Sequence, residues 1–176
     1  TANTKKGVVA GEGTSTEYAT KASTGSYRFD LTLSSFFKGT DQPFEDSAKS
    51  TTKKKYVSFE SNGQAYWFKI DSLDKKFKAC KENHLRATAI LLTEFADTLP
   101  EYAKYPGVAE YKANAGAHGL VTSQFTQFST LNEQGRNAWI AIIEFLASRY
   151  GTDVELYQNC YNTGTYGGGG LESIIV

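Results

Sequence analysis

The sequence predicts an α+β fold, in which an antiparallel sheet with a central hairpin is covered by two amphipathic helices. Two alternating runs of residues meet at Asn62-Gly63, a dipeptide that tolerates the two positive φ angles of a type I′ turn. After these runs the apolar residues recur at helical spacing in two separate stretches. Strands followed by helices are typical of α+β architecture, and 176 residues suit a single domain with a real core.

The N-terminal part of the chain divides into an extension, a strand and a loop. Residues 1–24 are rich in Thr, Ser, Gly and Ala, with too little apolar content to fold alone, so we expect an N-terminal extension. Residues 25–37 alternate apolar with polar side chains, which predicts a half-buried strand. Residues 39–52 form a polar loop that leads into the hairpin.

The turn at Asn62-Gly63 fixes the register of the hairpin. Counting outward from it pairs Phe59 with Tyr66, and opposed residues share a face of the sheet. One face is therefore apolar and carries Val57, Phe59, Tyr66, Phe68 and Ile70. The opposite face, here called the second face, carries Tyr56, Ser58, Trp67 and Lys69, beside the basic run Lys53, Lys54 and Lys55.

Two helices are expected after the hairpin. Ser72 can cap a long amphipathic helix that continues to Pro100 and docks on the apolar face of the hairpin. Cys80 falls on its apolar side, which predicts a buried thiol. A short element over 102–113 and a weak strand over 119–128 follow. The second helix spans 132–150, ends at Gly151 and has a broad apolar arc, so we expect it to be covered on more than one side.

We interpret residues 25–156 as the single α+β domain and residues 157–176 as a Tyr- and Gly-rich C-terminal extension. A lone domain gains too little from such terminal segments to offset their chain entropy. Pairing with neighbouring copies is the economical way to hold both extensions. The expected contact residues in the C-terminal extension are Tyr157, Tyr161, Tyr166, Leu171, Ile174, Ile175 and Val176.

The charge balance bears on possible partners. The chain carries 19 basic and 19 acidic residues, which argues against nucleic-acid binding by bulk attraction alone. Residues 1–55 have a net charge of +3, and residues 116–176 have a net charge of −3. Opposite charges on the two parts of the chain favour head-to-tail contact between copies.

No motif for catalysis, metal binding or a cofactor stands out. His84 and His118 belong to no metal-binding pattern, and the run Gly167–Gly170 lacks the Gly-Lys-Ser/Thr ending of a phosphate-binding loop. Cys80 and Cys160 are too far apart in sequence for a redox pair. We therefore expect no enzymatic activity, no metal and no cofactor. No stretch has the roughly 18 apolar residues of a membrane span, and a cytoplasmic or virion location is the default expectation.

Two functions remain open. The leading hypothesis is a structural subunit that assembles with copies of itself into a homopolymer such as a filament, tube or shell, for instance a virion or coat protein. The alternative is a single-stranded nucleic-acid-binding protein. In that reading bases stack on Tyr56 and Trp67, while phosphates contact Lys53, Lys54, Lys55 and Lys69. If Tyr56 and Trp67 are instead covered by the extension, the 39–52 loop or another copy, the assembly hypothesis is favoured.

Overall fold

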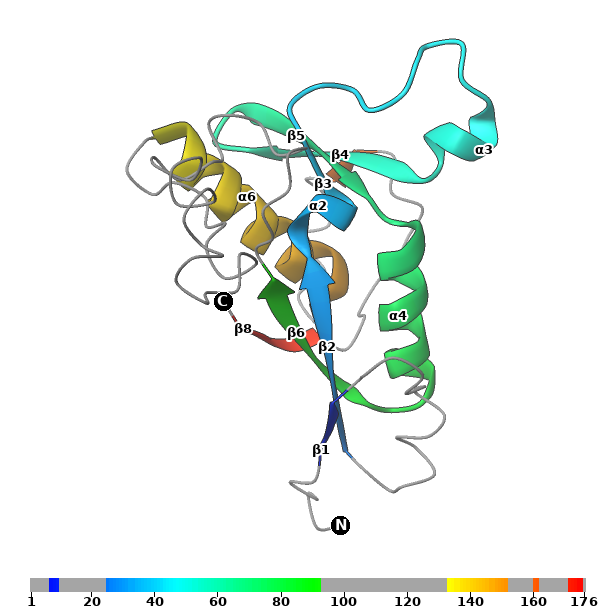
Figure 1. Cartoon of the computed structure of the whole chain (residues 1–176), viewed down its shortest axis with the longest axis vertical. Coiled ribbons are helices and arrows are strands. Elements are labelled where there is room, and N and C mark those ends of the chain that lie inside the picture. Colours follow the sequence, from blue (N-terminus) through cyan, green and yellow to red (C-terminus); the bar gives the residue numbers. More distant parts are fainter. Residues whose placement is uncertain (1–6, 10–24, 93–132, 152–159, 162–170, 176) are drawn as a thin grey trace, which may run out of the picture.

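The structure is a computed structural model, and it describes residues 7–9, 25–92, 133–151, 160–161 and 171–175. These residues form an α+β fold with one antiparallel sheet and one parallel sheet (Figure 1). They also form two long and two short helices. The predicted α+β class and the antiparallel sheet around the hairpin are confirmed, and the parallel sheet was not predicted.

The antiparallel sheet is built around the predicted hairpin. Its strand order is β3 (Phe37–Gly39), β5 (Gln64–Lys69), β4 (Tyr56–Ser61) and β7 (Cys160–Tyr161). Phe59 pairs with Tyr66, as the turn predicts. Asn62 and Gly63 have φ angles of 51° and 74°, the positive values that a type I′ turn requires. The predicted apolar face is buried throughout: Val57, Phe59, Tyr66, Phe68 and Ile70.

The parallel sheet joins segments that are distant in sequence. Its strand order is β1 (Gly7–Val9), β2 (Ser26–Thr32), β6 (Arg86–Leu92) and β8 (Leu171–Ile175). The strand predicted over 25–37 is confirmed as β2, with alternate side chains buried. The chain then turns through the short helix α2 (Leu33–Phe36) into β3, so the predicted strand is divided between the two sheets.

The first long helix is shorter than predicted. Helix α4 spans Asp71–Glu82, and Ile70 rather than Ser72 occupies its N-cap position. His84 ends it with a φ of 55°, and the N–H groups of His84 and Leu85 donate to the carbonyls of Lys81 and Cys80. This is the Schellman pattern of a helix C-terminus. The expected helix beyond residue 82 is wrong over 86–92, because alternate burial there belongs to strand β6.

The second long helix, α6 (Glu133–Tyr150), matches the prediction, and it covers the apolar face of the hairpin. The ring of Phe145 stacks on Phe68 at 3.9 Å between centroids. Helix α4 instead packs Phe77 against Phe29 of β2, at 5.3 Å. The prediction that the first helix docks on the hairpin is therefore corrected: α6 takes that place, and α4 lies beside the parallel sheet (Figure 1).

One continuous core joins these elements, and Tyr150 at the end of α6 links them by stacking on Phe77 at 4.0 Å. The thiol of Cys80 is buried in this core and free, as predicted. The short helix α3 (Ser50–Lys53) precedes the hairpin. The elements expected over 102–113 and 119–128, and most of both extensions, lie outside the described residues. Among the helices described here, none combines the length and apolar character needed to cross a membrane.

Candidate functional site

The second face of the hairpin is partly covered by the chain itself. Phe44, from the predicted 39–52 loop, lies edge-on to Trp67 with 5.3 Å between ring centroids. The same ring lies 5.8 Å from Tyr56. Trp67, Tyr56 and Phe44 are all half-buried. Among the described residues, Phe44 of the 39–52 loop therefore packs against both aromatic rings and would compete with a base for contact with them.

The predicted basic run takes part in structure as well as in surface charge. Lys53 lies in α3, and its ammonium donates to the carbonyl of Asp46 at 2.6 Å. Lys54 and Lys55 are exposed, and the carbonyl of Lys55 accepts the N–H of Ile70 at 2.8 Å. Lys53 thus ties the 39–52 loop to α3, while the ammonium groups of Lys54 and Lys55 belong to the surface beside the hairpin.

A further lysine joins Lys69 on the second face. The pairing of β3 with β5 shifts register between Phe37 and Gly39, which makes Lys38 the extra residue of a β-bulge opposite Trp67. Burial, followed by the nearby charge of Lys69, lowers the pKa of Lys38 below its ordinary value. Sequence reasoning missed Lys38, because a bulge between strands that are distant in sequence leaves no local pattern.

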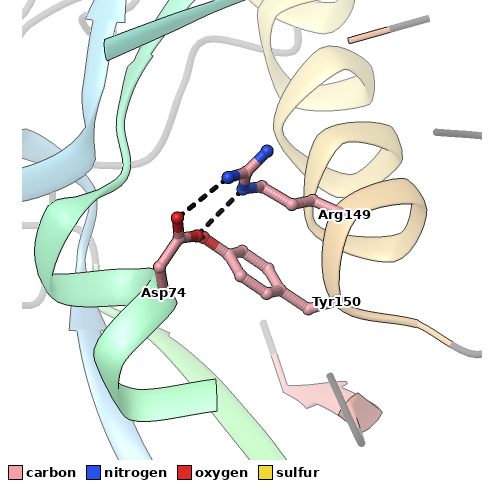
Figure 2. A network of polar contacts seen from close by, with 3 residues as sticks. All are labelled: Asp74, Arg149 and Tyr150. Atoms are coloured by element: carbon pink, nitrogen blue, oxygen red, sulfur yellow. Dashed lines mark hydrogen bonds and ion pairs between the residues drawn. The ribbon is translucent and has the colours of Figure 1, made fainter. Parts of the chain in front are cut away.

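A buried polar network links the two long helices (Figure 2). The Nε and Nη2 groups of Arg149 donate to the two carboxylate oxygens of Asp74, at 2.9 and 2.8 Å. The hydroxyl of Tyr150 donates to Asp74 at 2.7 Å. The side chain of Arg149 is 2% exposed and that of Asp74 is 27% exposed. The end of α6 is therefore fixed to the first turn of α4 by three hydrogen bonds to one carboxylate.

Burial and the contacts with Asp74 shift the pKa values of Arg149 and Tyr150, the two network residues on α6. Burial raises the pKa of Tyr150 well above its ordinary value, and the charge of Asp74 adds to this effect. Burial acts to lower the pKa of Arg149, but the hydrogen bonds and charge of Asp74 raise it overall. Arg149 thus stays charged and Tyr150 stays protonated. Within the described part of the chain, the Nη1 of Arg149 and one oxygen of Asp71 are buried without a hydrogen-bond partner.

Sequence reasoning did not find this network. A signal was present, because Arg149 is the one charged residue among the buried residues of α6, and a buried charge needs a partner. The identity of that partner depends on tertiary packing. Asp74 is in the first turn of α4, where a carboxylate also interacts favourably with the helix dipole.

The C-terminal residues that were predicted to make assembly contacts lie in different parts of the structure. Tyr161 lies in β7, where its backbone is opposite Ser58 of β4. In β8, Leu171 is buried and Ile174 packs against the core, whereas Ile175 is 43% exposed. Tyr157, Tyr166 and Val176 lie outside the described residues. β8 is thus paired within its own chain to β6, and Ile175 is the one of these side chains described as exposed.

The parallel sheet has one face turned away from the core, here called the outer face. It is formed by the alternate residues of β2 and β6 that do not enter the core, and by Glu172, Ser173 and Ile175 of β8, where the register shifts. Arg86 forms an ion pair with Glu172 at 3.0 Å, and the hydroxyls of Thr88 and Ser173 hydrogen bond at 2.8 Å. Ile90 is opposite Ile175. The members of the outer face are Arg28, Asp30, Arg86, Thr88, Ile90, Glu172, Ser173 and Ile175.

The geometry defines an α+β protein with a mixed-charge parallel sheet face and an aromatic hairpin face. Residues 1–160 match the sequence profile of DUF5722, a family of unknown function. The chain belongs to this family. Comparisons with curated proteins and with solved structures give no match.

Proposed function

We propose that this protein is a structural subunit that assembles with copies of itself into a homopolymer, and that the outer face of the parallel sheet takes part in the contact. The observation that carries the proposal is the exposure of this face. Arg28 and Asp30 of β2 are exposed, and Thr88 of β6 is only half-buried. Parallel sheets occur almost only with both faces covered. Among the described residues both long helices pack on the core side, so a second copy is a natural cover for the other side.

The chemistry of the outer face suits contact with an identical surface. Both signs of charge are present, with Arg28 and Asp30 on one strand and the Arg86–Glu172 pair beside them. Such a face offers each charge an opposite partner on a neighbouring copy. Ile90 and Ile175 add an apolar strip between the polar residues. The opposite net charges of residues 1–55 and 116–176 favour contacts that continue from copy to copy.

The edges of the parallel sheet are a second reason to expect that copies assemble into a polymer. β1 and β8 are the outer strands of the parallel sheet, and within the described residues each is paired on one side only. An unpaired strand edge is a template for pairing with another chain. Because β1 and β8 are different edges, a contact between them on successive copies is heterologous, and it builds an open polymer when the rotation between copies does not close into a ring.

Two isoleucines allow a matched test. Ile175 on the outer face and Ile140 on α6 are 43% and 42% exposed. We expect Ile175→Lys to lower the molar mass measured by light scattering to that of a smaller species, while Ile140→Lys leaves the mass unchanged. Circular dichroism checks that both variants stay folded. Equal masses for the wild type and both variants would show that the outer face takes no part in assembly.

Single-stranded nucleic-acid binding is the second candidate, and the presence of Lys38 and Lys69 on the face that carries Trp67 favours it. The contacts of Phe44 with Trp67 and Tyr56 weigh against it, because stacked bases would have to displace Phe44. For this reason we place self-assembly first.

A further inference from the structure

Two lysines lie close together at the second face of the hairpin. The β-bulge at β3 places Lys38 opposite Trp67, and the charge of Lys69 is near enough to act on the Lys38 ammonium. The ammonium of Lys38 is held by the carbonyl of Ser34, to which it donates at 2.7 Å. Both lysines are half-buried. The fold therefore holds the ammonium of Lys38 in place, and both lysines are less exposed than Lys54 and Lys55.

Among the residues that the structure describes, no carboxylate forms an ion pair with Lys38 or Lys69. The influences that shift the pKa of Lys38 are burial and the charge of Lys69, both of which lower it, and no carboxylate opposes them. Glu60, the acidic residue of β4 on this face, is opposite Ala65 near the turn, whereas Lys69 is opposite Tyr56 at the other end of the hairpin. The repulsion between the lysines is an electrostatic cost that a bound anion would relieve.

We propose that Lys38 and Lys69 bind the phosphate group of a small molecule, beside the ring of Trp67. A phosphate carries up to two negative charges near neutral pH and several acceptor oxygens, so it can accept from two ammonium groups at once. Lysine binds phosphate as a point charge and requires no planar geometry. The covered rings of Trp67 and Tyr56 leave the lysines as the part of this face that can recognise a ligand.

The test is a calorimetric titration of the full chain with inorganic phosphate, with ionic strength held constant by chloride. The wild type is expected to show saturable binding of one phosphate per chain. Lys38→Gln and Lys69→Gln should each weaken binding about tenfold or more, because each removes one charge-assisted hydrogen bond. Lys75→Gln makes the same change of charge at an exposed lysine of α4 and should leave the affinity within about twofold.

Backbone amide NMR shifts locate the bound ion and check the fold of each variant. Phosphate should shift the amides of β3 and β5 in the wild type and in Lys75→Gln, and should not shift them in Lys69→Gln. Absence of saturable binding would overturn the proposal, and so would an equal loss in all three lysine variants. If a single-stranded oligonucleotide binds through Lys69 while inorganic phosphate does not bind, the site belongs to a nucleic-acid backbone and the small-molecule proposal is wrong.

Discussion

Asp74 and Arg149 are 75 residues apart in sequence and form a two-point ion pair that joins the first turn of α4 to the last turn of α6. The guanidinium is almost fully buried, and the carboxylate also accepts from Tyr150. These bonds fix the relative positions of the two long helices, one on the hairpin and one on the parallel sheet. The core between the sheets depends on this placement.

Removing one partner of this pair should be strongly destabilising. We expect Asp74→Ala to lower the free energy of unfolding by about 3 kcal/mol or more, because Arg149 is left charged, buried and unpaired. The double variant Asp74→Ala with Arg149→Met should lose less than the sum of the two single variants. Urea denaturation measures all three. Lys78→Ala, which removes an exposed ion pair of α4, is the control and should cost below about 0.5 kcal/mol. Additive losses would contradict the account of the pair.

The hairpin turn should depend on the backbone conformation of Gly63. Its φ is 74°, and no atom lies within 4 Å of the position that a Cβ would occupy. The cost of Gly63→Val is therefore conformational rather than steric, and we expect a loss of about 1 kcal/mol or more of unfolding free energy. Gly63→Asn, which tolerates positive φ, should cost less. Equal thermal midpoints for the wild type and Gly63→Val would refute the turn assignment.

Cys80 should make the protein less stable in alkali. Burial raises its pKa from 9.0 to about 11. Between these values the unfolded chain loses the thiol proton while the folded chain keeps it, so stability falls as the pH rises through this interval. The contribution is about 3 kcal/mol, at about 1.4 kcal/mol for each pKa unit. Unfolding free energies measured from pH 8 to 11 should fall less steeply in Cys80→Ala than in the wild type. Parallel pH profiles would show that the thiol does not contribute.

Trp67 distinguishes the two candidate functions. Because Phe44 covers its ring, we expect blue-shifted emission that added single-stranded oligonucleotide does not change, measured in a Trp139→Phe background. Trp67→Ala should lower the free energy of unfolding by about 1 kcal/mol through loss of aromatic contact. Saturable quenching by the oligonucleotide, with assembly intact, would instead favour base stacking on this face.

Local patterns predicted the hairpin and helix α6 well. The Asn-Gly turn and the alternation on either side of it are contained within residues 56–69, so pairing, register and buried face could all be read from sequence. In helix α6 the apolar residues recur at helical spacing over 18 residues, so the helix could also be read from sequence. The parallel sheet could not be predicted in this way, because β2 and β6 are separated by the hairpin and α4 and leave no shared local signal.

The incorrect prediction of a helix after residue 82 has a physical cause. Leu85, Ile90 and Leu91 lie at spacings that suit a helix, and alanine at 87 and 89 has a high helix propensity. Burial nevertheless alternates along 85–91, and His84 takes the left-handed conformation that usually marks a helix end when glycine occupies it. Tertiary pairing with β2 thus overrides the local preference.

The candidate sites were predicted only in part. Trp67, Tyr56 and Lys69 could be assigned to one face because the hairpin register is local. Phe44 and Lys38 could not, since one comes from a loop and the other from a bulge in a strand that pairs across a long connection. The outer face escaped notice because its central strand, with Arg86, Thr88 and Ile90, is β6, where a helix was expected.

The mass of the native protein in solution tests self-assembly most directly. Sedimentation velocity of the purified wild type, with absorbance read at 260 and 280 nm, gives both the mass of the species and its nucleic-acid content. The account predicts species well above the 19.3 kDa of one chain, growing with protein concentration and free of nucleic acid. A single species of one-chain mass at every concentration would contradict it.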